Sequence, residues 1–310
     1  MDPDSGAYFK RSHITTLAIV TTLSFSAFYF YKEHRKAQEA KLKMAVKKDS
    51  TTIITASLPK EEQKVTVTKT NEPPASGKKK KTIYLTFDDG PNKGTQNVLN
   101  ILTEEKIPAT LFIIGQHVYG SHSQANIYDS LRNSAFVELA NHSYTHAHNK
   151  FSHFYTMPEK VLEDFKRCAD SLRFSSTIVR TPGRNIWRLN DIKHCDNPKS
   201  IAAADHLEKN GYTIMGWDLE WHFTNELKAV QSSEKLAMQV DSMFTHNRTR
   251  TKDHLVLLAH DQVYSNAKDS AALRKFVSIL KQKGEYHFAF INRYPGIEKK
   301  PVADSSQLKN

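Results

Sequence analysis

Cysteine is scarce in this chain, because its 310 residues contain only Cys168 and Cys195. Two cysteines allow at most one disulfide bridge, and they form no Cys-x-x-Cys pair, so a cysteine-ligated zinc site is not expected. Two states stay open: a Cys168–Cys195 bridge, which an exported protein would permit, and two unpaired thiols.

The chain also lacks the excess charge that a nucleic-acid-binding body needs. The formal net charge of +11 is concentrated at the N-terminus, where residues 1–81 hold 16 Lys and Arg against 8 Asp and Glu. The remaining residues hold 28 against 25, a net charge of +3. Because nucleic-acid binding depends on a basic surface, this balance excludes it as the main function.

Long apolar stretches are missing apart from one uncharged run of 18 residues, 14–31, which has basic residues on both sides. Its length is at the lower limit for a membrane-spanning helix. It also contains a small-x-small pattern at residues 24–26, which is typical of signal-peptide cleavage sites. We expect residues 1–35 to be a signal anchor or a cleaved signal peptide. The body would then lie outside the cytoplasm, anchored to the cell membrane in the first case and secreted in the second.

The rest of the chain divides by composition. Residues 36–81 are polar, rich in Lys and Thr, and end in NEPPASGKKKK, which predicts a flexible basic linker. Residues 82–300 have the sequence pattern of a folded domain and contain no internal repeats. Residues 301–310 are expected to form a disordered tail.

Short apolar runs alternate with helical patterns throughout residues 82–300. Strands are expected at 83–87, 110–114, 136–140, 177–180, 213–217, 255–259 and 288–291. Helices are expected at 95–105, 125–133, 158–174, 201–210, 233–245 and 270–283, and residues 187–198 are interpreted as a loop insertion. This alternation predicts an α/β fold with a mostly parallel sheet, either doubly wound or closed into a barrel.

Ionisable residues follow five of the expected strands at the point where each strand ends. These residues are Asp88 and Asp89, His142 and His146, Arg180, Glu220, and His260. Parallel α/β folds place reactive side chains at the C-terminal ends of their strands, so these residues are expected to share one site. A solvated Asp-Gly-Pro turn would explain the two aspartates alone, but not the residues at the other four strand ends.

A metal site is expected among these groups. His142 and His146 are four residues apart, so a helical segment would present both imidazoles on one face. Asp89 from the neighbouring strand end would complete two histidines and one carboxylate. Such a set leaves a coordination position open for water, which is typical of catalytic sites and not of structural ones.

Five segments in order, TFDDGP, HSYTH, RTPG, WDLEW and LLAHD, resemble the motifs of the NodB-homology polysaccharide deacetylases, carbohydrate esterase family 4. The resemblance covers about residues 82–295. It implies a distorted (β/α) barrel of fewer than eight complete units, here about seven, with a metal-dependent N-deacetylase site.

The family resemblance also implies individual roles. Asp89, His142 and His146 would bind a divalent metal, zinc being expected and cobalt, nickel or manganese being the alternatives. Asp88 would be the general base that activates the attacking water, and His260 the general acid that protonates the departing amine.

Supporting roles follow from the same resemblance. Arg180 would hold Asp88 ionised and oriented, and Glu220 would orient His260. Trp221 and Leu258 would wall the pocket for the acetyl methyl group. The substrate-binding residues are expected to include, in addition, Pro182 and Arg184.

The chain departs from the family pattern in three places. Glu220 stands where the family usually has Asp, one methylene shorter, which puts the geometry of its pairing with His260 in question; Asp218 is the alternative partner. The third motif continues with Arg184 in place of an aromatic residue or a second proline, so the substrate groove is expected to differ. Ala140 replaces a frequent glycine.

The resemblance implies removal of N-acetyl groups from N-acetylglucosamine units of a polysaccharide. Peptidoglycan is preferred, and a chitin-like oligosaccharide or a surface glycan is the alternative polymer. Two other functions stay open: an amidase or esterase acting on a small acylated substrate, and a catalytically silent carbohydrate-binding barrel. The expected partners are the acetylated glycan and, through residues 14–31, the membrane; nucleic acid is not expected, and the chain is expected to be a monomer.

Overall fold

A computed structural model describes residues 81–297, which belong to the unit Ser76–Asn310 of this chain. The expected anchor or signal segment, all but the last residue of the expected linker, and the expected tail lie outside the described residues. Among the helices of residues 81–297, none has the length and apolar character that crossing a membrane requires.

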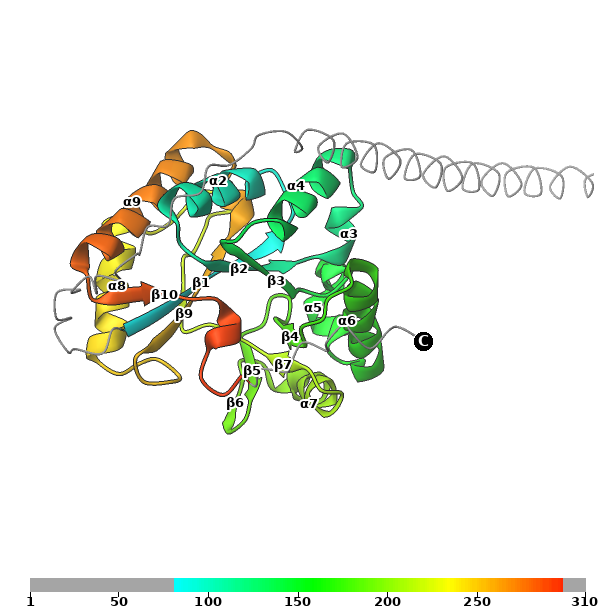
Figure 1. The fold of residues 1–310 in the computed structure, drawn as a ribbon. Helices are drawn as coiled ribbons and strands as arrows, with labels where there is room; N and C mark the ends of the chain where they lie inside the picture. Colours follow the sequence, from blue (N-terminus) through cyan, green and yellow to red (C-terminus); the bar gives the residue numbers. More distant parts are fainter. Residues whose placement is uncertain (1–80, 298–310) are drawn as a thin grey trace, which may run out of the picture. The chain divides into compact units, whose positions relative to one another are not determined.

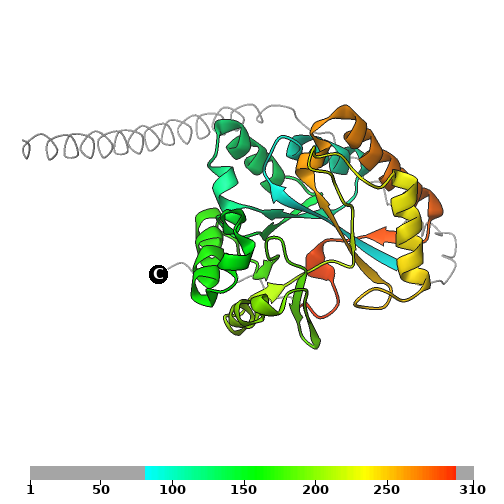
Figure 2. The ribbon, with the colours of Figure 1, turned by 180° about the vertical axis from the view of Figure 1, so that it is seen from behind.

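The strands form one curved sheet, with helices on its outer side (Figures 1 and 2). Its order is β6-β5-β7-β4-β3-β2-β1-β9-β8, and β10 pairs with the beginning of β1. The strands are β1 (Lys81–Gly90), β2 (Ala109–Ile113), β3 (Val137–Asn141), β4 (Ile178–Val179), β5 (Ile186–Leu189), β6 (Ile192–Cys195), β7 (Thr213–Ile214), β8 (Leu219–Glu220), β9 (His254–His260) and β10 (Tyr286–Phe288). Within the described residues, no pairing joins β6 to β8, so the barrel is distorted and open there.

Helices separate most of the parallel strands, as the alternating sequence pattern predicts. They are α2 (Thr95–Glu105), α3 (Gly115–Val118), α4 (His122–Arg132), α5 (Phe151–Phe154), α6 (Pro158–Leu172), α7 (Ile201–Lys209), α8 (Ser233–Thr245) and α9 (Ala267–Lys283). The bounds of α2 and α8 coincide with those expected, and the prediction of a distorted (β/α) barrel is confirmed.

The two faces of the sheet bury different apolar clusters because side chains alternate along a strand. In β1, Ile83, Leu85 and Phe87 pack in the large core between the sheet and its surrounding helices. Tyr84 lies on the other face, in a second cluster that includes Trp187 of the hairpin. Asp88 lies at the C-terminal end of β1 on the same face as Tyr84, so it faces the interior of the barrel.

Two expectations are settled by the fold. Residues 187–198 are not only a loop, because β5 and β6 pair antiparallel within this segment and β5 also joins β7. The buried guanidinium of Arg188 stabilises the hairpin by pairing with Asp205 of α7. Cys168 and Cys195 are both unpaired thiols, the first of them buried in the core.

Candidate active site

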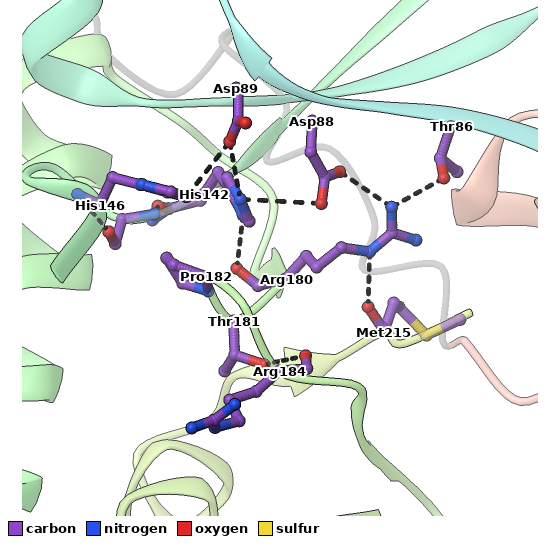
Figure 3. Close-up of polar contacts among 12 residues, drawn as sticks. Thr86, Asp88, Asp89, His142, His146, Arg180, Thr181, Pro182, Arg184 and Met215 are labelled. Carbon is purple, nitrogen blue, oxygen red and sulfur yellow. Dashed lines mark hydrogen bonds and ion pairs between the residues drawn. The ribbon is translucent and has the colours of Figure 1, made fainter. Parts of the chain in front are cut away.

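A β-bulge at the end of β1 separates the directions of the two adjacent carboxylates. Asp88 is in register with Phe112 of β2, and Gly90 with the next residue, Ile113, so Asp89 is the extra residue. Its backbone has a φ of 75°, in the left-handed region that Asp tolerates better than most residues. A bulge bends the strand and redirects its side chains. Figure 3 shows the result: the two carboxylates leave β1 toward different neighbours.

Asp88 forms a buried ion pair with Arg180. Its Oδ1 lies 2.9 Å from Nη1 of Arg180, and both side chains are almost completely buried. The guanidinium also donates to Oγ1 of Thr86 and to the carbonyl oxygen of Met215 (Figure 3). A further bond joins its Nη2 to the carbonyl oxygen of Gly216. Together these acceptors fix the plane of the guanidinium, so Arg180 is held in place and orients the Asp88 carboxylate.

Asp89, His142 and His146 converge, as the sequence predicts. Oδ1 of Asp89 lies 3.5 Å from Nε2 of His142 and 3.2 Å from Nε2 of His146 (Figure 3). One ligand atom from each of these three residues lies within 4.8 Å of the other two. The three atoms could therefore hold one metal ion.

The hydrogen bonds on the far side of each ring support such a metal ion. Nδ1 of His142 lies 2.9 Å from the carbonyl oxygen of Arg180, and Nδ1 of His146 lies 2.9 Å from Oδ1 of Asn149. Because both partners are acceptors, each Nδ1 carries a proton, and in the neutral rings each Nε2 presents a lone pair. Oδ1 of Asp89 is buried and has no hydrogen-bond partner among the described residues. Two ring lone pairs and an unpaired carboxylate oxygen facing one another fit a cation.

The charge of Asp89 agrees with this interpretation. Burial alone would raise the pKa of the Asp89 carboxyl. When no metal is bound, protonated rings of His142 and His146 would donate to this carboxylate through Nε2, and these hydrogen bonds and their charge outweigh the effect of burial. The pKa of Asp89 is therefore held well below its usual value. The set of two imidazole nitrogens and one ionised carboxylate is one that zinc and related transition metals accept.

The segment between the two histidines is not the helix that their spacing suggested. His142 directly follows β3, and the next helical residues begin only at His146. Asp164 of α6 holds the intervening loop, because its Oδ2 accepts hydrogen bonds from the backbone N–H groups of Tyr144 and Thr145. The loop therefore brings the two imidazoles together without a shared helical face.

His260 lies beside Asp88 because the two residues are in register on neighbouring parallel strands. Nδ1 of His260 is buried and has no hydrogen-bond partner among the described residues. The ring of Phe223 packs against the imidazole, with the two ring centroids 4.8 Å apart. An aromatic contact, and not a carboxylate, is thus the neighbour that orients His260 here.

The expected Glu220–His260 pair is absent from the described part of the chain. The Glu220 carboxylate instead lies 3.5 Å from Nδ1 of the exposed residue His222. Asp218 does not replace it, because its two carboxylate oxygens accept hydrogen bonds from the backbone N–H groups of Arg250 and Val256. The longer Glu side chain is a physical reason for the difference, since it carries its carboxylate one methylene further from the strand.

Trp221 and Leu258 are both buried. Trp221 is 2% exposed, packs against Tyr264 and Phe276 in the large core, and donates Nε1–H to the carbonyl oxygen of Gln231. Leu258 is also 2% exposed and is in register with Thr86 of β1. Trp221 is therefore part of the large core, and the role of Trp221 and Leu258 as walls of the acetyl pocket stays a prediction.

Pro182 and Arg184 follow the buried ion pair in the RTPG segment. Pro182 is buried, and its carbonyl oxygen accepts a hydrogen bond of 2.7 Å from the hydroxyl of Tyr155. Arg184 donates to the carbonyl oxygen of Gly183, while its buried Nε has no hydrogen-bond partner in the described residues. In Figure 3, Arg184 lies away from the Asp88–Arg180 pair, so it does not share in that pair.

Two residues that the sequence analysis missed hold Asp89 in place. Nδ1 of His117 lies 2.9 Å from the backbone oxygen of Asp89, and Nε2 of Gln262 donates to its Oδ2 at 3.4 Å. Neither residue belongs to a motif with a recognisable spacing. Only its place directly after His260 and Asp261 could have indicated Gln262.

Asp261 supports the turn that follows Asp89. It is fully buried, and its carboxylate accepts hydrogen bonds from the side chains of Asn92 and Thr95. A Cβ atom at Gly90 would lie 2.7 Å from Oδ2 of Asp261, and one at Gly94 only 1.8 Å from its backbone oxygen. The close approach requires glycine at both positions. Asp261 thus connects the strand end that carries His260 to the turn that carries Asp89.

Comparisons with known proteins found relatives of this chain. A family model described as polysaccharide deacetylase matches residues 75–183, a range that includes the buried ion pair and the three candidate ligands but not His260. Peptidoglycan-N-acetylglucosamine deacetylase of Bacillus cereus is 27% identical over 234 residues, which cover 74% of this chain and 77% of that protein. Chitin disaccharide deacetylase of Vibrio alginolyticus is 25% identical, with 69% of this chain and 71% of that protein covered.

A solved structure shares the fold. The catalytic domain of peptidoglycan N-acetylglucosamine deacetylase from Eubacterium rectale superposes with a TM-score of 0.51 at 21% sequence identity. The alignment covers 72% of this chain and 94% of that domain. At this level of identity the similarity supports the fold and not the substrate.

Proposed function

The chain belongs to the NodB-homology polysaccharide deacetylases, and from this we propose that it hydrolyses the N-acetyl groups of N-acetylglucosamine units in a glycan. One observation carries the proposal: Asp88, paired with Arg180, lies between the three candidate metal ligands and His260. Base, metal site and acid are thus adjacent at the C-terminal ends of neighbouring strands.

Asp89, His142 and His146 would hold the metal through Oδ1 and the two Nε2 atoms. A divalent metal bound there supplies Lewis acidity, which makes a water more acidic and stabilises negative charge on the acetamide oxygen. Zinc fits this donor set best, and cobalt, nickel or manganese could replace it.

Asp88 is the general base of the proposed mechanism. Its Oδ1 is engaged by Arg180, which leaves Oδ2, 3.6 Å from Nε2 of His142, to accept the proton of the attacking water. The water oxygen bonds to the acetyl carbon as that proton moves to Asp88. Arg180 contributes by keeping the carboxylate ionised before the step.

His260 is the general acid. Its Nδ1 is buried, so Nε2 is the ring nitrogen that can meet the substrate. When the bond between carbon and nitrogen breaks, His260 donates a proton to the departing amine, and acetate is released. Phe223 holds the ring in position by packing against it.

Peptidoglycan is the proposed polymer, with a chitin-like oligosaccharide or a surface glycan as the alternative. Relatives named for peptidoglycan and for chitin disaccharide are about equally similar to this chain. The polar residues 36–81 favour peptidoglycan, because a tether of this kind suits a domain that faces a cell wall.

Two other functions compete with the proposal. A silent carbohydrate-binding barrel would not need a complete set of ligands, base and acid, and all of these are present. A small acylated substrate would undergo the same chemistry, and only a comparison of substrates distinguishes it.

We further propose that the catalytic domain acts outside the cytoplasm, attached to the membrane by residues 14–31 or secreted after their removal. The uncharged run of 18 residues supports this location. Expression of the intact chain, followed by fractionation into cytoplasm, membrane and medium, tests it. Recovery of the full-length protein in the cytoplasm alone would contradict it.

The function itself is tested by measuring acetate released from peptidoglycan, chitin oligosaccharides and a small acetanilide. We expect release from an acetylated glycan that stops after chelator treatment and returns when zinc is added. Asp88→Asn should still bind zinc but release no acetate, whereas Asp89→Asn should lose zinc binding while its left-handed backbone stays tolerated. Full activity of Asp88→Asn would contradict the mechanism, and release from the acetanilide alone would contradict the substrate.

A further inference from the structure

A left-handed turn carries one of the candidate metal ligands. His146, Ala147, His148 and Asn149 have φ angles of 52°, 56°, 47° and 57°, so four consecutive residues other than glycine lie in the left-handed region. Side chains of L-amino acids disfavour this region, and non-glycine residues usually visit it singly. The surrounding structure must therefore hold the turn in this shape.

The turn supplies both a candidate ligand and the acceptor that orients it. Nε2 of His146 lies 3.2 Å from Oδ1 of Asp89, while Nδ1 lies 2.9 Å from Oδ1 of Asn149. Asn149 is three residues further along the chain, and the backbone of the turn returns its side chain to the ring. Asn is also among the residues that best tolerate a left-handed backbone.

Other contacts fix the remaining sides of the His146 ring and its backbone. The backbone N–H of His146 donates to Oγ of Ser143 at 3.1 Å. The ring meets Phe151 edge-on, with centroids 5.3 Å apart and planes at 87°. Gly183 leaves the space for Phe151, since a Cβ atom there would lie 3.1 Å from the Phe151 ring. Rotation of the imidazole is thus limited on one edge by Phe151 and at Nδ1 by Asn149.

The two candidate histidine ligands differ in how they are oriented. His142 uses the backbone carbonyl oxygen of Arg180 as its acceptor, which no substitution can remove directly. His146 uses a side chain, and Asn149 is exposed, so it can be replaced without opening the core. The His146–Asn149 bond is therefore the part of the ligand orientation that substitution can test.

We propose that Asn149 is a positioning residue for the metal site, and that the left-handed turn serves to place its side chain on Nδ1 of His146. The amide oxygen keeps the proton on Nδ1 and directs the lone pair of Nε2 toward Asp89. This inference rests on the proposed function, because it requires that His146 bind a metal. Asn149 does not touch the substrate or the metal; it acts through His146.

The test measures zinc affinity of the intact, metal-stripped protein by competition with a chromogenic chelator. Asn149→Gly removes the acceptor while allowing the left-handed backbone, and Asn149→Asp retains an acceptor at the same position. Because partners behind a metal-binding histidine contribute about 10–100-fold to affinity, we expect Asn149→Gly to raise the zinc Kd by on the order of 10-fold. Asn149→Asp should stay within about threefold of the wild type, since its carboxylate still accepts the Nδ1 proton.

A control variant separates the acceptor from the backbone. His148→Gly changes the same turn at an exposed side chain, and its zinc Kd should match that of the wild type. Within the described residues, the ring contacts of His146 are with His142 and Phe151 and not with His148. The absorption spectrum of the cobalt-loaded protein provides a second readout. It should change for Asn149→Gly and stay unchanged for His148→Gly, because only the first alters the orientation of a ligand.

Several outcomes would overturn the inference. Wild-type zinc affinity in Asn149→Gly would show that the acceptor is dispensable, and an equal loss in His148→Gly would assign the effect to the backbone. If the wild-type protein binds neither zinc nor cobalt, the metal site of the proposed function fails and this inference fails with it. If the wild-type protein binds zinc and Asn149→Gly binds it with the same Kd, the proposed function stands and this inference alone is wrong.

Discussion

Oδ1 of Asp88 lies 2.9 Å from Nη1 of Arg180, and the side chains are only 4% and 0% exposed. A buried pair of this kind is stable only when both charges are present, because each compensates for the water that the other has lost. The carbonyl oxygens of Met215 and Gly216 and the hydroxyl of Thr86 accept further guanidinium N–H groups, so four of the five N–H groups of Arg180 have an acceptor. The stability of the domain therefore depends on an ion pair that includes its proposed base.

Removing Arg180 alone should destabilise the fold strongly. In Arg180→Met the Asp88 carboxylate stays buried without its cation, and we expect a loss of about 3–5 kcal/mol in the free energy of unfolding, measured with urea. The double variant Arg180→Met with Asp88→Asn removes the unpaired charge and should regain a clear part of that loss. Additive effects of the two substitutions would contradict the coupling.

A pH dependence follows from Asp261. Burial, together with a smaller contribution from the nearby charge of Asp89, raises the pKa of its carboxyl to about 7, despite hydrogen bonds from Thr95 and Asn92. The unfolded chain releases this proton near the ordinary value of 3.8. Between these values the folded state holds a proton that the unfolded state has lost, so the free energy of unfolding falls as pH rises from about 4 to about 7.

Asp261→Asn should remove this dependence. The amide has nearly the shape of the carboxyl but does not ionise, so the variant should gain on the order of 2–4 kcal/mol relative to the wild type between pH 4 and pH 8. Urea unfolding across this range, with chelator present, measures the difference. Asp191→Asn at an exposed position is the control, and its free energy of unfolding should change with pH as that of the wild type does. The same pH dependence of the free energy of unfolding in Asp261→Asn as in the wild type would contradict the prediction.

Much of this site could be predicted from the sequence because its residues lie at the ends of strands. The spacing of apolar runs located β1, β3 and β9, and residues at the ends of parallel strands must meet at one edge. Asp88, Asp89, His142 and His260 therefore came together without any knowledge of loops. The family motifs added the roles, but proximity follows from topology alone.

The remaining features depend on tertiary contacts that no local pattern contains. The β5–β6 hairpin has short strands with polar residues, and it forms because Arg188 is buried against Asp205 of α7. The loop between His142 and His146 follows the carboxylate of Asp164, not helical periodicity. Asp164 did leave a signal, since it is a charged residue among the buried positions of α6.

Glu220 should matter less for catalysis than the family pattern implies. Its carboxylate lies beside His222, and within residues 81–297 no hydrogen bond or ion pair joins it to His260. We expect Glu220→Gln to lower kcat by less than about tenfold and to leave the basic limb of the pH–rate profile in place. His260→Gln should lower kcat by about 10²–10⁴-fold, as expected for loss of a general acid. Equal losses in the two variants would restore Glu220 as the partner of His260.

Substitution by glycine usually lowers the free energy of unfolding, but in the strained left-handed turn we expect it to raise it. His148 is exposed with a φ of 47°, and glycine would occupy this region without steric cost. Glycine also makes the unfolded chain more flexible, which offsets part of the gain, so we expect His148→Gly to raise the free energy of unfolding by roughly 0.5 kcal/mol. Lys150, exposed in the same segment with a φ of −105°, is the matched control, and Lys150→Gly should lower it by about 0.5–1 kcal/mol. Urea unfolding of the metal-free protein measures both, and a loss in His148→Gly as large as that in Lys150→Gly would mean that the turn stores no strain at this residue.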